Sequence, residues 1–138
     1  MKNTFLLLLL LLFGCVQKSS GPVEIKPIVP VGAPLSGNQA LQNGPMLGYV
    51  EMKEVLIWVQ TKTFAGVQVE YWETGKPGQK WRTDLVQTNK NSAFTAKCIA
   101  DQLEPGVQYD YRVEINGGSV LLSYPTTFKT QPLWQWRV

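Results

Sequence analysis

The chain has 138 residues, which is enough for one domain, and its hydrophobic content of 44% is typical of a globular protein. The formal net charge is +3 and the basic residues are scattered, so charge gives no reason to expect nucleic-acid binding. Histidine is absent, which removes the most common general base and the most common metal ligand.

The N-terminus has the pattern of an export signal. Lys2 supplies one positive charge, and an unbroken apolar run of nine residues follows from Phe5 to Phe13. A signal peptide needs an apolar region of about 7–15 residues, whereas a membrane-spanning helix needs about 20. The length therefore favours a signal peptide over a permanent transmembrane anchor.

The apolar run ends at Leu12-Phe13-Gly14-Cys15, which resembles the lipobox of bacterial lipoproteins. We predict a signal peptide over residues 1–15 and a lipid on the thiol of Cys15. Several acyl chains together would anchor the chain stably in a membrane. The expected location is the bacterial cell envelope, periplasmic or associated with the outer membrane. The alternative is an ordinary secretory signal in which Cys15 has no role.

Residues 16–42 are rich in proline and glycine. Their four prolines disfavour a helix and favour extended chain, so we predict a disordered tether between the anchor and the domain. These are Pro22, Pro27, Pro30 and Pro34. The alternative is an edge strand that contains proline, over residues 24–31.

Residues 43–132 contain short runs of β-branched and aromatic residues separated by turn signals, with no helical period. This pattern predicts an all-β fold, a seven-stranded immunoglobulin-like or fibronectin-III-like sandwich. The predicted strands are Met46–Glu51, Glu54–Thr61, Val67–Glu73, Lys80–Gln87, Ala93–Leu103, Val107–Ile115 and Val120–Thr130, the last interrupted by Pro125. Asn116-Gly117-Gly118 should form a hairpin turn that tolerates positive φ.

One local motif supports the sandwich directly. Leu103 is followed by Pro105-Gly106 and then by Tyr109, the arrangement of a tyrosine corner. In such a corner the phenol packs beside the turn and its hydroxyl bonds to the backbone upstream. These residues indicate a fold and no chemistry.

Five apolar side chains form a candidate docking surface for another domain, because a contiguous exposed apolar patch usually marks a contact site. We predict that Leu56 and Trp58 face outward beside Trp72 on a neighbouring strand, and that the C-terminal Trp134 and Trp136 extend the same surface. The alternative is that the tether or long side chains cover the patch.

The sequence holds no pattern of catalytic or metal-binding residues. The carboxylates are dispersed, no nucleotide-binding fingerprint occurs, and Ser119 and Ser123 have no nearby base. Cys98 is in phase with core positions of its strand, which predicts a buried thiol. Trp81 and Arg82 would stack on a sugar or, more simply, form a cross-strand pair. We therefore predict no catalytic residue, no metal site and no cofactor in this chain.

The motifs also occur in a recognisable order, from Gly44-Pro45-Met46-Leu47-Gly48 through Val55–Thr61, Val67–Trp72 and Leu103–Val113 to Phe128–Pro132. This order resembles the N-terminal fibronectin-III-like domain of the alkaline phosphatase D (PhoD-like) family over residues 44–132. In that family a metallophosphoesterase domain follows, binds metal ions and hydrolyses phosphate esters. None of its ligand motifs occurs here, so no catalytic residue carries over.

The resemblance implies a non-catalytic, lipid-anchored accessory domain of a PhoD-like phosphatase. Its expected partners are the membrane and a metallophosphoesterase domain, and not nucleic acid. Residues 133–138 are then expected to begin a linker to a missing catalytic domain, which would make the chain a truncated form. Two alternatives remain: a free-standing envelope lipoprotein that binds a protein or a glycan, and a residual hydrolase.

Overall fold

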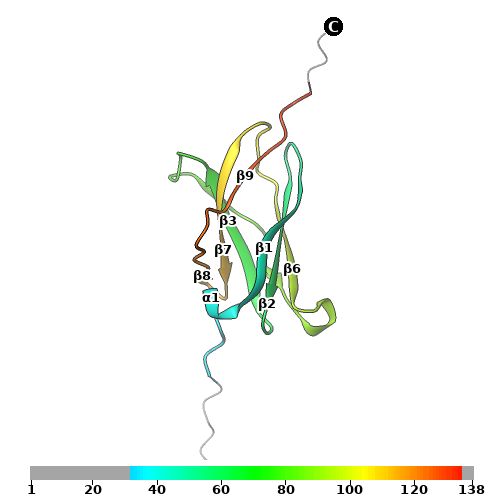
Figure 1. Cartoon of the computed structure of the whole chain (residues 1–138), viewed down its shortest axis with the longest axis vertical. Helices are drawn as coiled ribbons and strands as arrows, with labels where there is room; N and C mark the ends of the chain where they lie inside the picture. The colour runs from blue at the N-terminus through cyan, green and yellow to red at the C-terminus, as the bar shows by residue number, and fades with distance from the viewer. Residues whose placement is uncertain (1–31, 135–138) are drawn as a thin grey trace, which may run out of the picture. The chain divides into compact units, whose positions relative to one another are not determined.

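The computed structural model describes residues 32–134. It contains one short α-helix, nine strands and one turn of 3-10 helix in that part of the chain (Figure 1). Their bounds are α1 Gly37–Ala40, β1 Leu41–Val50, β2 Val55–Thr61, β3 Gly66–Glu73, β4 Lys80–Arg82, β5 Val86–Gln87, η1 Lys90–Ser92, β6 Thr95–Ala100, β7 Gln108–Ile115, β8 Gly118–Ser119 and β9 Thr127–Lys129.

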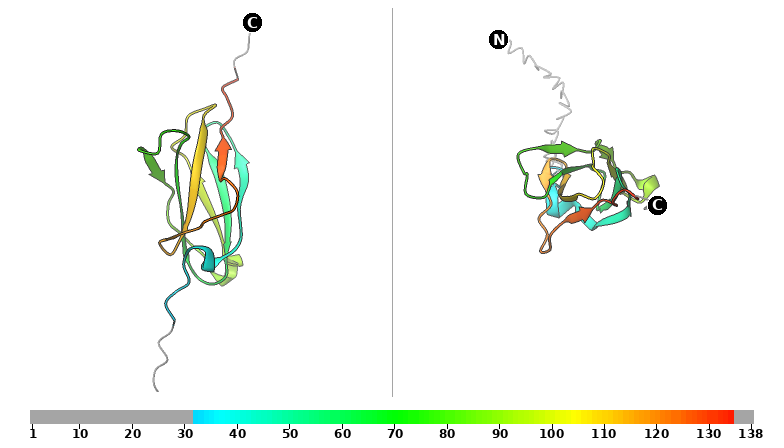
Figure 2. Two further views of the ribbon diagram at one scale, coloured as in Figure 1. Left: turned by 60° about the vertical axis from the view of Figure 1, so that its left-hand side comes forward. Right: turned by 90° about the horizontal axis from the view of Figure 1, so that it is seen from above.

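The strands form two antiparallel sheets, and the all-β sandwich is therefore confirmed (Figure 2). Sheet A has the order β1-β2-β6. Sheet B has the order β4-β3-β7-β8, with β5 also paired to β3 and β9 also paired to β7. No helix in the described part of the chain is long and apolar enough to cross a membrane.

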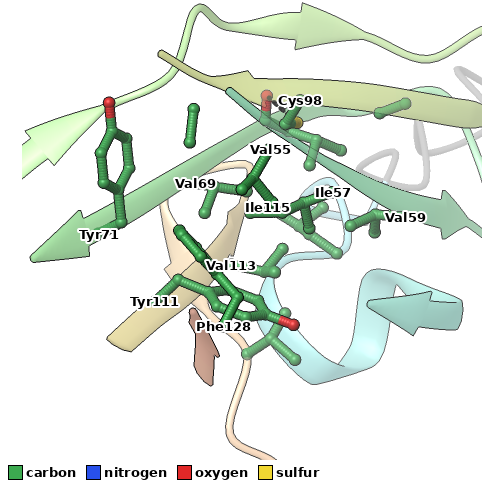
Figure 3. Packing of buried hydrophobic residues seen from close by; sticks show 14 of the residues in the cluster. Val55, Ile57, Val59, Val69, Tyr71, Cys98, Tyr111, Val113, Ile115 and Phe128 are labelled. Carbon is green, nitrogen blue, oxygen red and sulfur yellow. Dashed lines mark hydrogen bonds between the residues drawn. The ribbon is translucent and has the colours of Figure 1, made fainter. Parts of the chain in front are cut away.

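The core lies between the sheets and follows the two-residue period of the strands. Val55, Ile57 and Val59 of β2 point inward, and so do Val113 and Ile115 of β7 (Figure 3). Because successive side chains of a strand point to opposite faces, the residues between them point outward. This alternation fixes which side chains are available on the surface.

One predicted strand is divided in two and another is shortened. In the segment predicted as Lys80–Gln87, the Thr83 hydroxyl oxygen accepts a hydrogen bond from the Val69 amide at 3.0 Å, in the position of a ladder carbonyl. β4 and β5 therefore pair with different parts of β3. Of the predicted seventh strand, Val120–Thr130, only β9 forms, after Pro125, while β8 lies just before its predicted start.

The domain begins earlier than predicted. Residues 37–42 were assigned to the tether, yet they form α1 and the start of β1, and the side chain of Ala40 is buried. The Lys62 amide donates to the Ala40 carbonyl at 2.9 Å, which ties this segment to the turn after β2. The signal peptide, Cys15 and most of the predicted tether, including the alternative strand at 24–31, lie outside the described residues.

The hairpin turn after β7 is confirmed. Asn116 has a φ of 50° and Gly117 a φ of 77°, both in the left-handed region. Asparagine and glycine tolerate this region better than other residues do. The Asn116 side chain also accepts from the Gly66 amide at 2.9 Å, so the turn is held against the start of β3.

Candidate interaction surfaces

The described residues offer little chemistry for catalysis. Among residues 32–134 there is no group of three or more acidic, cysteine or histidine side chains that could hold a metal ion. Cys98 is buried, and burial raises the pKa of its thiol to about 11. Because the thiolate is the reactive form, this thiol is a core residue and a poor nucleophile. Cys15 lies outside the described residues.

The residues of the predicted tyrosine corner come together in one turn. The Glu104 amide donates to the Tyr109 hydroxyl oxygen at 2.9 Å, and Leu103 and Tyr109 are both buried. Gly106, one residue after Pro105, has a φ of +72° and packs against Pro132. The corner thus joins the loop before β7 to the segment after β9, and its role is structural.

The predicted docking residues do not form one surface. Leu56 and Trp58 lie on β2 in sheet A, whereas Trp72 lies on β3 in sheet B, on the opposite outer face. The prediction assumed that β2 and β3 pair. Residues 62–65 instead carry the chain from one sheet to the other, and Ala65 is buried in that crossing. Trp134 lies beyond β9 and is 81% exposed, and Trp136 lies outside the described residues.

The outer face of sheet A carries apolar side chains on all three strands. Leu56 and Trp58 are half-buried in its centre on β2, and strand pairing places other apolar side chains on either side of them. We call this surface the apolar face and define it as Met46, Tyr49, Leu56, Trp58 and Ile99. Met46 pairs with Trp58, and Ile99 pairs with Leu56.

Two details shape the apolar face. A side chain at Gly48 would collide with the Leu56 side chain, so glycine there lets Leu56 lie over the bulged part of β1. The Tyr49 hydroxyl bonds to the Glu54 carboxylate, and this bond raises the pKa of Tyr49 to about 12. Lys97, paired with Trp58, is the one charged residue that β6 presents here. The surface is therefore mainly apolar, with the Lys97 ammonium on its β6 side and the Glu54 carboxylate beside Tyr49.

The outer face of sheet B is charged. Glu70 of β3 is only 7% exposed and accepts from cations on both neighbouring strands. Its carboxylate lies 2.5 Å from an Arg112 nitrogen, 3.4 Å from an Arg82 nitrogen and 3.5 Å from the Lys80 ammonium. We call this the charged face and define it as Glu70, Lys80, Arg82, Arg112 and Glu114.

The titration of Glu70 reflects this environment. Burial alone would raise the pKa of its carboxyl group, but the charges of Arg112 and Lys80 and the hydrogen bonds from Lys80 and Arg82 outweigh it. The pKa is therefore held below its ordinary value. Each charged side chain of this face is already in an ion pair, so a partner that binds these groups would have to break ion pairs.

A shallow groove lies beside the charged face. It has a volume of about 390 Å³ and is bounded by Trp72 and Asp110 on the sheet and by Leu121 and Tyr124 on the segment before β9. The Lys80 ammonium lies 4.9 Å from the centre of the Trp72 ring. Trp72 thus belongs to a mixed aromatic and polar groove and not to the apolar face.

Residues 38–133 match the family described as Domain of unknown function (DUF7800). The chain belongs to this family. No curated protein sequence matches the chain.

Several solved structures resemble the DUF7800 domain at low identity. The sensor domain of the anti-sigma factor RsgI4 from Pseudobacteroides cellulosolvens is 19% identical, with a TM-score of 0.52, over 72% of this chain and 93% of that one. PhoD is 20% identical, with a TM-score of 0.54, over 67% of this chain and 19% of that one. The fibronectin domain of human contactin 1 is 21% identical over 77% and 92%, with a TM-score of only 0.43. Such likenesses concern the fold alone.

Sequence reasoning missed part of the DUF7800 domain's surface. Met46, Tyr49 and Ile99 were not singled out, although Ile99 follows Cys98 and must point outward if Cys98 points inward. The charged face was also missed, because its members come from three strands whose pairing had to be known. Trp81 forms a cross-strand pair with Tyr71, their ring centres 6.0 Å apart, so the simpler of its two predicted roles is confirmed.

Proposed function

We propose that this DUF7800 domain is a non-catalytic accessory domain that docks through its apolar face onto a metallophosphoesterase domain of the PhoD type. A lipid on Cys15 would hold it at the bacterial cell envelope. The observation that carries the proposal is the apolar face itself: Met46, paired with Trp58, is 56% exposed, and Ile99, paired with Leu56, is 42% exposed. Aromatic residues and methionine are enriched in protein interfaces, and a contiguous exposed apolar patch usually marks one.

Two further observations support the choice of partner. The motifs of residues 44–132 follow the order that resembles the front domain of PhoD-like phosphatases. A fold of this kind also occurs in the structure of PhoD, where the matched part makes up 19% of the chain. An accessory domain in this setting needs a contact surface and no catalytic group of its own.

The docking proposal is tested by adding the partner in trans. Purified residues 16–138 should bind a PhoD catalytic domain that lacks its own front domain, measured by isothermal titration calorimetry. Trp58→Ser should weaken this binding at least tenfold, because central aromatic residues dominate interface energies. Trp72→Ser, on the other sheet, is the matched control and should leave the affinity unchanged. Equal losses in both variants would contradict docking through the apolar face.

Catalysis by the domain alone is tested separately. Residues 16–138 with added divalent metal ions should hydrolyse a phosphodiester substrate no faster than the buffer blank. Turnover well above the blank that survives repeated purification would support the residual hydrolase and contradict an accessory role.

Lipid attachment is tested in cells. A bacterial host fed a labelled fatty acid should incorporate the label into the wild-type chain and not into Cys15→Ser. Label in both proteins, or in neither, would leave the ordinary secretory signal as the better explanation of residues 1–15.

A second function is favoured by the groove at Trp72. Two aromatic rings beside a carboxylate and a guanidinium provide both a stacking surface and hydrogen-bonding groups, as a glycan requires. A free-standing envelope module would then bind a glycan there. Quenching of tryptophan fluorescence by envelope glycans that is lost in Trp72→Phe and kept in Trp58→Phe would favour this function over docking.

A further inference from the structure

The two ends of the sandwich differ in charge. The end where the described chain begins comprises α1, the turn after β2, the segment from β5 to η1 and the turn after β7, and we call it the N-terminal pole (Figure 1). It is made of residues 33–40, 61–66, 86–94 and 116–121. These segments contain two lysines, Lys62 and Lys90, and no acidic residue.

The chain leaves after β9 at the opposite end of the sandwich (Figure 2), and that end is acidic. We call it the C-terminal pole, made of residues 50–54, 73–79, 101–107 and 130–134. It carries five carboxylates and two lysines: Glu51, Glu54, Glu73, Asp101, Glu104, Lys53 and Lys76. The formal charge is therefore +2 at one pole and −3 at the other.

The segments of the N-terminal pole are bonded to one another. The Asn38 amide donates to the Leu121 carbonyl at 2.6 Å, and the Asn116 side chain donates to the Leu35 carbonyl at 2.7 Å. The Asn116 amide donates to the Gly66 carbonyl at 2.9 Å. These bonds join three of the four segments, residues 33–40, 61–66 and 116–121, into one surface.

Apolar side chains project from this pole. Phe64, in the turn after β2, is 64% exposed, Leu121 is 75% exposed and Leu35 is 38% exposed. Lys62 lies two residues before Phe64, and neither Lys62 nor Lys90 forms an ion pair with any residue of the described part. Exposed aromatic and aliphatic groups beside unpaired lysines are the features that bind anionic lipid surfaces.

We infer that the N-terminal pole is a membrane-contact surface that rests on an anionic lipid bilayer, with Phe64 entering the interface and Lys62 and Lys90 beside the phosphate groups. The chain enters the domain at this pole 18 residues after Cys15, so the proposed lipid anchor tethers the domain by this end, within about 60 Å of the bilayer. The acidic C-terminal pole is repelled by the same surface and points away from it. The apolar face, on the side of the sandwich, stays free for a partner.

The contact is tested without the lipid, on residues 16–138, which include the whole described domain. The probe is a set of vesicles made of equal parts phosphatidylcholine and phosphatidylglycerol, with pure phosphatidylcholine vesicles for comparison. The domain should float with the anionic vesicles, and the bound fraction should fall as salt is raised. Lys62→Glu with Lys90→Glu should weaken partitioning at least about 25-fold, since the loss of each lysine near an anionic surface alone costs roughly fivefold and each glutamate adds repulsion.

Phe64→Ala should weaken partitioning about tenfold, because the ring no longer enters the interface. The matched control is Lys53→Glu with Lys76→Glu, which makes the same charge change at the C-terminal pole and should have little effect. Absence of binding to anionic vesicles would overturn the inference, and so would equal losses in the two double variants. The vesicles contain no partner domain, so failure here leaves the docking proposal standing, and failure of docking leaves this result standing.

Discussion

The two outer faces of the sandwich differ in the side chains that they expose to solvent. Sheet B covers its outer side with ion pairs, in which Glu70 of the central strand holds cations from β4 and β7. Sheet A leaves Met46, Tyr49 and Ile99 in solvent around the half-buried Trp58. The same fold therefore carries one face whose charged groups form ion pairs with each other and one face whose apolar groups remain without cover in the described chain. The difference indicates where a partner gains most by binding.

The difference between the two faces depends on the alternation of β6, in which Cys98 points into the core and Ile99 points to the outer face of sheet A. Cys98 should therefore react with a thiol reagent at pH 8 at least about a hundredfold more slowly in the native domain than in urea, because it is buried and its pKa is about 11. A cysteine placed at the next position, Ile99→Cys, is the matched control and should react at nearly the unfolded rate. Fast labelling of native Cys98 would show that sheet A does not close the core as described.

The next largest effect separates the faces by binding. Met46→Lys with Ile99→Lys adds two charges to the apolar face and should weaken docking to a PhoD catalytic domain about a hundredfold, since buried unpaired charges in an interface are costly. Gln108→Lys with Thr127→Lys makes the same change on exposed positions of sheet B. Calorimetry should find the second variant close to wild type. Losses of similar size in both would remove the distinction between the faces.

A third change should separate the faces by stability. Glu70→Gln leaves Lys80, Arg82 and Arg112 without their shared carboxylate and should lower the free energy of unfolding by about 2 kcal/mol, measured with urea. Docking should be unaffected. Glu73→Gln removes a single pair between Glu73 and the exposed Lys76 and should cost no more than about 0.5 kcal/mol. A Glu70 variant as stable as the Glu73 variant would mean that the charged face contributes little.

The smallest expected effect is the pH dependence of the difference in unfolding free energy between wild type and Glu70→Gln. The pKa of Glu70 is lower in the folded domain than its ordinary value, so its ionised form stabilises the fold above the ordinary pKa of about 4.5, and this contribution is lost as pH falls through the folded pKa. The stability gap between wild type and Glu70→Gln should be full at pH 7 and smaller at pH 3. A gap that is constant from pH 7 to pH 3 would contradict the direction of the shift.

The sequence was sufficient for the fold class, because alternation, turn residues and the Leu103–Tyr109 motif are local signals. It was also sufficient for the buried position of Cys98 and for the hairpin at Asn116. The sequence could not show which sheet contains Trp72. The four residues that connect β2 to β3 have the length of a hairpin loop, but they cross from sheet A to sheet B. The charged face depends on the register of three strands, and register is set by the folded whole.

The start of the domain was missed for a related reason. Pro34 and Gly37 made residues 33–42 look like a tether, but Ala40 is buried and Asn38 bonds to Leu121, more than eighty residues later in the chain. A hydrogen bond between residues so far apart in the sequence cannot be predicted from the local amino-acid composition. Hydrogen bonds to distant residues therefore set the start of the domain, and the same bonds hold the loops of the N-terminal pole together.

The most direct measurement is nuclear magnetic resonance mapping of residues 16–138 during titration with a PhoD catalytic domain. If docking uses the apolar face, signals of Met46, Leu56 and Ile99 shift or broaden, whereas those of Glu70, Arg82 and Arg112 remain unchanged. Perturbations confined to the charged face, or spread equally over both faces, would contradict docking through the apolar face.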